Sequence, residues 1–166
     1  MTLLHTIIAF IVALGVLIVV HEYGHYLVAR LCGVKVLRFS VGFGRALWVK
    51  RIGRDQTEWV VAAIPFGGYV KMLDEREGVV APQDAHRAFN RQSVSRRFFI
   101  VIAGPVFNFL FAILVYAGLF MYGLPEARPV LGTAPAGTVA AAAGVQSGDT
   151  VGAVDGEPVS TWQELR

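Results

Sequence analysis

The sequence predicts an α-helical membrane protein: two transmembrane helices, a β-hairpin-containing loop between them, and the start of a β-rich domain after the second helix. The composition is the first observation, because 55% of the 166 residues are hydrophobic and only 16% are charged. The second is a pair of apolar runs, residues 3–29 and 98–123. At about 1.5 Å per helical residue, each run exceeds the roughly 30 Å of a bilayer core. The third is a segment between the runs in which glycines interrupt β-rich stretches.

The first predicted element is a transmembrane helix over residues 1–30, which contains the sequence HEYGH at positions 21–25. It does not fit a cleaved signal peptide, because it is too long, no basic residue precedes it and no small-residue cleavage site ends it. His21 and His25 are four residues apart, so they share a helix face and can bind one Zn²⁺. Glu22 lies about 100° around the helix, where it can act as a general base. Ionisable groups are costly in an apolar helix and indicate function; the alternative is a buried soluble helix with a satisfied His-Glu-His cluster.

The charge distribution predicts the orientation of the helices. Of the 15 Lys and Arg residues, 13 lie between Arg30 and Arg97, and none precedes the first apolar run. Six acidic residues lie in the same segment, so its net charge is +7. The positive-inside rule places residues 31–97 in the cytoplasm and both ends of the chain on the other side, which is the periplasm in a bacterium. The pI near 9.3 follows from this topology and from anionic lipid headgroups, and it requires no nucleic-acid partner.

The cytoplasmic, membrane-associated segment 31–97 contains two β-rich stretches, residues 34–49 and 57–72. Glycines at 42, 44, 67 and 68 and a proline at 65 predict hairpin strands with bends. A free strand edge can pair with an extended peptide, so both a substrate-clamping strand and an ordinary scaffold hairpin fit this pattern. Residues 73–95 are polar and predict a loop with a short helix near its end.

The second transmembrane helix is predicted over residues 98–124. Pro105 removes a backbone N–H and predicts a kink, and Gly104 allows a close approach by another helix. Counted from the arginine at the cytoplasmic end of its own helix, His21 lies about 13.5 Å deep and Asn108 about 16.5 Å deep. The two side chains should therefore lie at a similar depth. Asn108 can orient the substrate or hold a catalytic water, or it can make a plain interhelical hydrogen bond.

Four stretches together resemble the site-2 protease family of intramembrane zinc metalloproteases, and within it the bacterial regulator-of-sigma-E protease branch. They are HEYGH at 21–25, GFG at 42–44, IPFGGYVKM at 64–72 and AGPVFN at 103–108. The resemblance implies an enzyme of the bacterial inner membrane that cleaves transmembrane segments of membrane proteins, such as an anti-sigma factor. It implies Zn²⁺ as cofactor, His21 and His25 as its ligands, and Glu22 as the general base. We expect the substrate to contact a further set of residues: Gly67, Gly68, Tyr69, Val70, Lys71 and Asn108.

Residues 125–166 resemble the start of a bacterial PDZ domain. An Ala-rich stretch leads to GVQSGD at 144–149, then to a β-run with an Asp155-Gly156 turn. A PDZ domain binds a peptide end by adding a strand to its sheet, so the resemblance implies a peptide or protein ligand. The roughly 38 residues from 129 to 166 are too few to bury a core of their own. We therefore expect residues 1–166 to be an N-terminal fragment of a longer protease.

The sequence departs from the family pattern at the third zinc ligand. A catalytic zinc takes three protein ligands, and the family draws the third from an aspartate in a motif that this chain lacks. His5 is about 24 Å from His21 along a continuous helix, so Asp74, Asp84 and His86 are the weak candidates that remain. We expect the fragment alone to be inactive. The alternative functions are a non-proteolytic metal-binding protein, which would have no use for Glu22, and a proton-relay protein, which would need more membrane spans.

Overall fold

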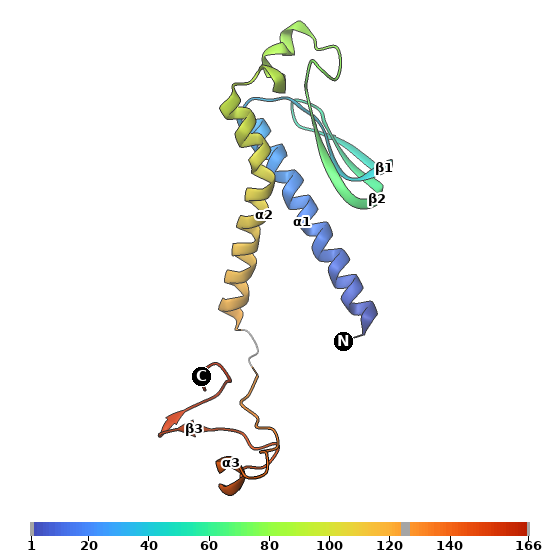
Figure 1. The fold of residues 1–166 in the computed structure, drawn as a ribbon. Helices are drawn as coiled ribbons and strands as arrows, with labels where there is room; N and C mark the ends of the chain where they lie inside the picture. The colour runs from blue at the N-terminus through green and yellow to red at the C-terminus, as the bar shows by residue number, and fades with distance from the viewer. Residues whose placement is uncertain (1, 124–126, 166) are drawn as a thin grey trace. The chain divides into compact units, whose positions relative to one another are not determined.

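The computed structural model describes residues 2–123 and 127–165, which form two compact units, Met1–Tyr116 and Ala117–Arg166. Figure 1 shows two long helices and a curled pair of strands in the first unit. The predicted domain boundary at residues 124–125 lies outside the described residues. The elements in chain order are α1 (Leu3–Leu31), β1 (Val36–Ile52), β2 (Thr57–Met72), η1 (Pro82–Arg87), η2 (Phe89–Arg91), α2 (Val94–Tyr122), α3 (Val139–Ala142), β3 (Ala153–Val154) and β4 (Glu157–Pro158).

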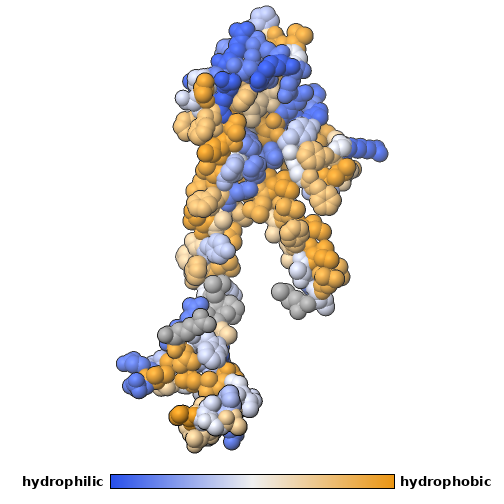
Figure 2. Space-filling view, viewed as in Figure 1, coloured by the Kyte–Doolittle hydropathy of each residue, from blue (hydrophilic) through white to orange (hydrophobic). Residues whose placement is uncertain are grey.

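Both long helices have the length and apolar composition needed to cross a membrane. Each has 29 residues, which span about 43 Å, so each exceeds the bilayer core. Large apolar side chains cover their surfaces (Figure 2), and exposed examples are Phe10, Phe109 and Leu114. α2 continues through Pro105 as one helix. The two predicted membrane-capable helices are therefore confirmed, and α2 begins four residues before the predicted start.

The end of α1 turns the chain back toward the helix. Gly33 adopts a left-handed φ of +82°, which favours glycine. The backbone N–H of Gly33 donates to Arg30 O, and the N–H of Val34 donates to Ala29 O, so two terminal carbonyls of the helix are satisfied. Val34 is fully buried. The turn delivers β1 directly beside the helix that carries HEYGH.

The two β-rich stretches form the two strands of one hairpin. β1 and β2 pair antiparallel around a turn at residues 53–56. Residues 38–41 of β1 pair with β2 on both sides. Phe39, for example, is opposite both Val70 and Trp59. The hairpin therefore curls, and in the described pairing residues 68–72 of β2 have partners in β1 alone. The curl requires Gly42, where φ is +92° and an added β-carbon would lie 2.8 Å from the Ile64 carbonyl oxygen.

A small core joins the hairpin to the ends of both helices. Its aromatic centre is Tyr26 of α1, whose ring lies 5.7 Å from Phe39 and 5.2 Å from Trp59 in edge-on contacts. The Arg87 guanidinium makes a bidentate ion pair with Asp55, which ties η1 to the hairpin turn. These contacts fix the hairpin against the C-terminal end of α1. The fully buried apolar members of the core are Ala29, Val34, Val36 and Ile100.

After the end of α2, the described residues of the second unit form short elements. An isolated bridge pairs Val130 with Thr150, and the Thr138 hydroxyl accepts a hydrogen bond from the Ala141 N–H at the start of α3. β3 and β4 form a hairpin whose turn is Asp155-Gly156, with φ of 51° and 88°. Two positive φ values are typical of a type I′ turn. The predicted Asp-Gly turn is confirmed, while the PDZ domain stays a prediction.

Candidate metal centre

The two histidines of HEYGH share one face of α1, as their spacing predicts. Their ring centroids are 4.9 Å apart and their planes are inclined by 78°. A β-carbon added at Gly104 of α2 would lie 2.5 Å from the Nε2 atoms of both His21 and His25. Both nitrogens therefore lie against Gly104, where α2 has no side chain. Two imidazoles on one helix face can bind a single zinc ion, through zinc–nitrogen bonds of about 2.0–2.1 Å.

The other ring nitrogen of each histidine contacts α2. His25 Nδ1 lies 2.7 Å from the carbonyl oxygen of Ile100. A carbonyl only accepts hydrogen bonds, so Nδ1 carries the proton and Nε2 keeps its lone pair for a metal. On the other side, His21 Nδ1 lies 3.4 Å from Asn108 Nδ2. The predicted common depth of His21 and Asn108 is confirmed by this contact.

Close packing of the two helices makes these contacts possible. Gly24 of α1 is buried, and a β-carbon there would lie 2.7 Å from the Ala103 carbonyl oxygen and 2.9 Å from Phe107. Any larger residue would push the helices apart. The histidines on either side of Gly24 therefore reach α2 because the backbones meet at this glycine.

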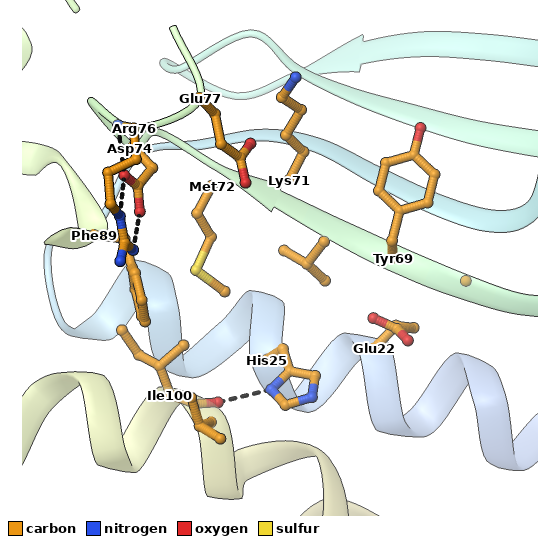
Figure 3. A pocket seen from close by; sticks show the side chains of 13 residues that line it. Glu22, His25, Tyr69, Lys71, Met72, Asp74, Arg76, Glu77, Phe89 and Ile100 are labelled. Atoms are coloured by element: carbon orange, nitrogen blue, oxygen red, sulfur yellow. Dashed lines mark hydrogen bonds and ion pairs between the residues drawn. The ribbon is translucent and has the colours of Figure 1, made fainter.

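Glu22 points toward the hairpin. A β-carbon added at Gly68 would lie 2.9 Å from Glu22 Cγ, so the carboxylate side chain packs over the glycine. Glu22, His25 and residues 68–72 of β2 line a cavity of about 590 Å³ (Figure 3). Its far wall carries charged side chains, Asp74, Arg76 and Glu77. The cavity thus places a carboxylate, an imidazole and one strand around a single space.

The predicted substrate-contacting residues divide into three groups. Gly68, Tyr69, Val70 and Lys71 line the cavity with Glu22. Gly67 lies beside it, under the ring of Phe43. Asn108 contacts His21 on the α2 side.

Two of the three weak candidates for a third metal ligand, Asp74 and Asp84, are engaged elsewhere. Asp74 is paired with Arg76, and this guanidinium lowers the pKa of the Asp74 carboxyl below its usual range. Asp84 accepts a hydrogen bond from Lys35 at 2.7 Å. Within residues 2–123 and 127–165, no group of three or more His, Cys, Asp and Glu side chains is placed to hold a metal ion. The described residues therefore bring two imidazoles together, those of His21 and His25.

Two contributions of α2 went unrecognised in the sequence. The Ile100 carbonyl fixes the His25 proton, and Gly104 leaves the space against which both Nε2 atoms lie. Residues 100, 104 and 108 are spaced by four and so lie along one face of the helix. Within the apolar run of α2, this four-residue spacing is the sequence signal that could have indicated the contributions of Ile100 and Gly104.

Comparisons with known proteins identify the family of this chain. The profile of Peptidase family M50 matches residues 9–161. The chain is 52% identical to the Yersinia pestis protein named Protease RseP, and the match covers all of this chain and 37% of the relative. It is 54% identical to the Escherichia coli Regulator of sigma-E protease RseP (95% of this chain, 35% of the relative). It is 51% identical to a candidate zinc metalloprotease of Neisseria meningitidis, and the match covers 96% of this chain and 35% of the relative.

The chain therefore spans a little over a third of the length of these relatives. The matched region holds most of α1, all of α2, the hairpin and the HEYGH sequence. Because the family profile covers nearly all of the chain and several relatives exceed 50% identity, this protein is a member of peptidase family M50.

Proposed function

We propose that this chain supplies the zinc-binding and proton-transferring part of an intramembrane metalloprotease. The observation that carries the proposal is that His21 Nε2 and His25 Nε2 of an apolar helix lie together against Gly104, with Glu22 beside them. Two imidazole donors fit a zinc ion, and relatives named as zinc metalloproteases support that metal. When bound, zinc supplies Lewis-acid activation for peptide hydrolysis.

The residues of this chain then have distinct roles. His21 and His25 hold the metal, and Ile100 fixes the proton of His25 on Nδ1. Glu22 takes a proton from the attacking water and returns it to the leaving amine, as a general base and then acid. A third ligand is required from outside the described residues, and the family resemblance assigns it to an aspartate on another membrane helix.

We propose that the substrate binds as an extended strand beside residues 68–71. This segment lines the cavity with Glu22, and in the described pairing its strand partners lie on one side only. A peptide added along the other side would gain backbone hydrogen bonds and would lie against the carboxylate. Gly68 favours this arrangement, because it has no side chain between the strand and Glu22.

The substrate class and the location are proposals as well. Relatives named as regulators of sigma-E support a transmembrane substrate such as an anti-sigma factor. The 13-of-15 basic bias supports a bacterial inner-membrane protein with residues 31–97 in the cytoplasm and both ends of this chain in the periplasm. Residues 125–166 would begin a periplasmic PDZ domain that binds a peptide or protein ligand.

The test uses the full-length protein that contains this sequence, reconstituted in vesicles with a transmembrane model substrate. His25→Ala should remove both zinc and cleavage, because one of the two imidazole donors is lost. The matched control is His5→Ala, which removes a histidine of the same helix whose ring is hydrogen-bonded to the Thr2 hydroxyl. If wild-type protein holds zinc but cleaves no membrane substrate, the alternative of a non-proteolytic metal-binding protein takes its place.

A further inference from the structure

Asn108 has one unexplained group at the candidate metal centre. Its Oδ1 atom is buried and has no hydrogen-bond partner, while its Nδ2 atom lies 3.4 Å from His21 Nδ1. A buried carbonyl-type oxygen without a partner costs free energy, because water satisfied it before folding. The same contact places a donor group against the nitrogen of a metal-binding imidazole.

This arrangement conflicts with metal binding at His21. If Asn108 Nδ2 donates to His21 Nδ1, the imidazole proton must be on Nε2. His21 Nε2 is the atom that lies with His25 Nε2 against Gly104, and a metal needs its lone pair. A neutral His21 that binds metal carries its proton on Nδ1 and therefore needs an acceptor there.

A half-turn of the carboxamide resolves the conflict at His21. It exchanges Oδ1 and Nδ2, which have nearly the same size and shape. Oδ1 then accepts the His21 Nδ1 proton and His21 Nε2 is freed, while Nδ2 takes the former position of Oδ1. We propose that Asn108 is a positioning residue for His21, and that its Oδ1 accepts from Nδ1 when metal is bound; this rests on the proposed zinc site.

The other histidine of the site, His25, already has a hydrogen bond of the kind proposed for His21. His25 Nδ1 already donates to a carbonyl oxygen of α2, that of Ile100, at 2.7 Å. Ile100 and Asn108 lie one turn before and one turn after Gly104, so α2 presents an acceptor to each imidazole and a gap between them. Hydrogen-bonded partners of this kind set the tautomer and orientation of metal-binding histidines.

This role differs from a substrate contact or a plain helix–helix bond. A residue that only contacts substrate leaves zinc affinity unchanged when it is replaced. A residue that only joins the helices alters stability and gives no preference for an acceptor over a donor. A positioning residue needs an acceptor, so aspartate should replace asparagine and alanine or leucine should not.

The experiment measures zinc affinity of the full-length protein in detergent by competition with a chelator. Asn108→Leu and Asn108→Ala should lower the affinity about 10–100-fold. Asn108→Asp should stay within about threefold of wild type, because its carboxylate accepts from Nδ1. The matched control is Phe109→Leu, one residue along α2 and 69% exposed, which should have no effect. With Co²⁺ as probe, the visible spectrum should be retained in the Asp variant and shifted in the Ala and Leu variants.

Two results would overturn the assignment. One is wild-type zinc affinity in both the Ala and Leu variants. The other is an equal loss in the Asp variant, which would mean that the amide donates to His21. A wild-type protein that binds zinc and cleaves no substrate would remove the proposed protease function while leaving the Asn108 assignment intact, because the readout is metal affinity.

Discussion

His25 of α1 and Ile100 of α2 are joined by a hydrogen bond from the imidazole Nδ1 to the backbone carbonyl oxygen, at 2.7 Å. The bond joins residues 75 apart in the chain and fixes which nitrogen of His25 is free. The candidate metal centre is therefore a product of two helices. HEYGH supplies the nitrogens, and α2 determines where they point.

Substitution of Gly104 should abolish metal binding. In Gly104→Ala the new methyl group would lie 2.5 Å from both Nε2 atoms, so it would displace the imidazoles that we expect to bind the ion. We expect zinc affinity to fall at least about tenfold, as judged by metal content after dialysis. Gly118→Ala, on the same helix with no atom within 4 Å of the added carbon, is the matched control and should retain zinc.

Gly24→Ala separates metal binding from helix packing. Its methyl group would meet Ala103 and Phe107 rather than the imidazoles. We expect a lower melting temperature in detergent for this variant, because the helices must move apart. Gly104→Ala should lose zinc at a temperature where it is still folded. Equal melting temperatures and equal zinc content for the two variants would contradict the distinction.

Thiol labelling of intact cells tests the orientation. With Cys32 replaced by Ser, single cysteines at Thr2 and at Ala136 should react with a membrane-impermeant reagent added outside, provided that it passes the outer membrane. A cysteine at Gln83 should react only after the cells are opened. The basis is the concentration of Lys and Arg between residues 30 and 97. Labelling of position 83 in closed cells would reverse the topology and place the proposed PDZ domain in the cytoplasm.

The Asp55–Arg87 ion pair should make stability fall in acid. The Arg87 guanidinium, with smaller effects from Arg30 and Lys35, holds the pKa of the Asp55 carboxyl below its usual range. A carboxyl with a lowered folded-state pKa stabilises the fold above its unfolded pKa of about 3.9, and this contribution is lost as pH falls through the lowered value. Arg87→Met should reduce the free energy of unfolding at pH 7 by about 1–3 kcal/mol, since Asp55 is only 11% exposed.

The measurement is unfolding in mixed micelles between pH 2.5 and 7. Wild type should lose the Asp55 contribution below about pH 4, and Arg87→Met should have a flatter profile. Arg91→Met removes an ion pair to the more exposed Glu75, so it is the control and should change stability little. An unchanged profile in Arg87→Met would show that this pair does not secure η1 to the hairpin.

Much of the fold follows from local patterns in the sequence. Uninterrupted apolar runs predicted both helices, and the four-residue spacing placed His21 and His25 together, because helix geometry is set by the nearest neighbours along the chain. The depth of Asn108 followed from the same geometry. The curl of the hairpin did not, since the double pairing of Phe39 with Trp59 and Val70 depends on long-range register.

The finer geometry of the site also lay beyond the sequence. Gly104 was recognised as a place where helices approach, but its position opposite both Nε2 atoms depends on the rotation of α2 about its axis. The partner of His25 is a backbone carbonyl, and every residue has one. The amino-acid sequence therefore does not indicate which carbonyl accepts the hydrogen bond from His25.

The most direct test of the account replaces Glu22 by Gln in the full-length protein. The amide keeps the shape of the carboxylate but cannot take a proton from water, while the donors His21 and His25 are untouched. We predict stoichiometric zinc in the purified variant and cleavage of a membrane-embedded substrate at least about 10²-fold slower than wild type. Zinc content near wild type together with cleavage near wild type would contradict the assignment of Glu22 as the base, and with it the proposed mechanism.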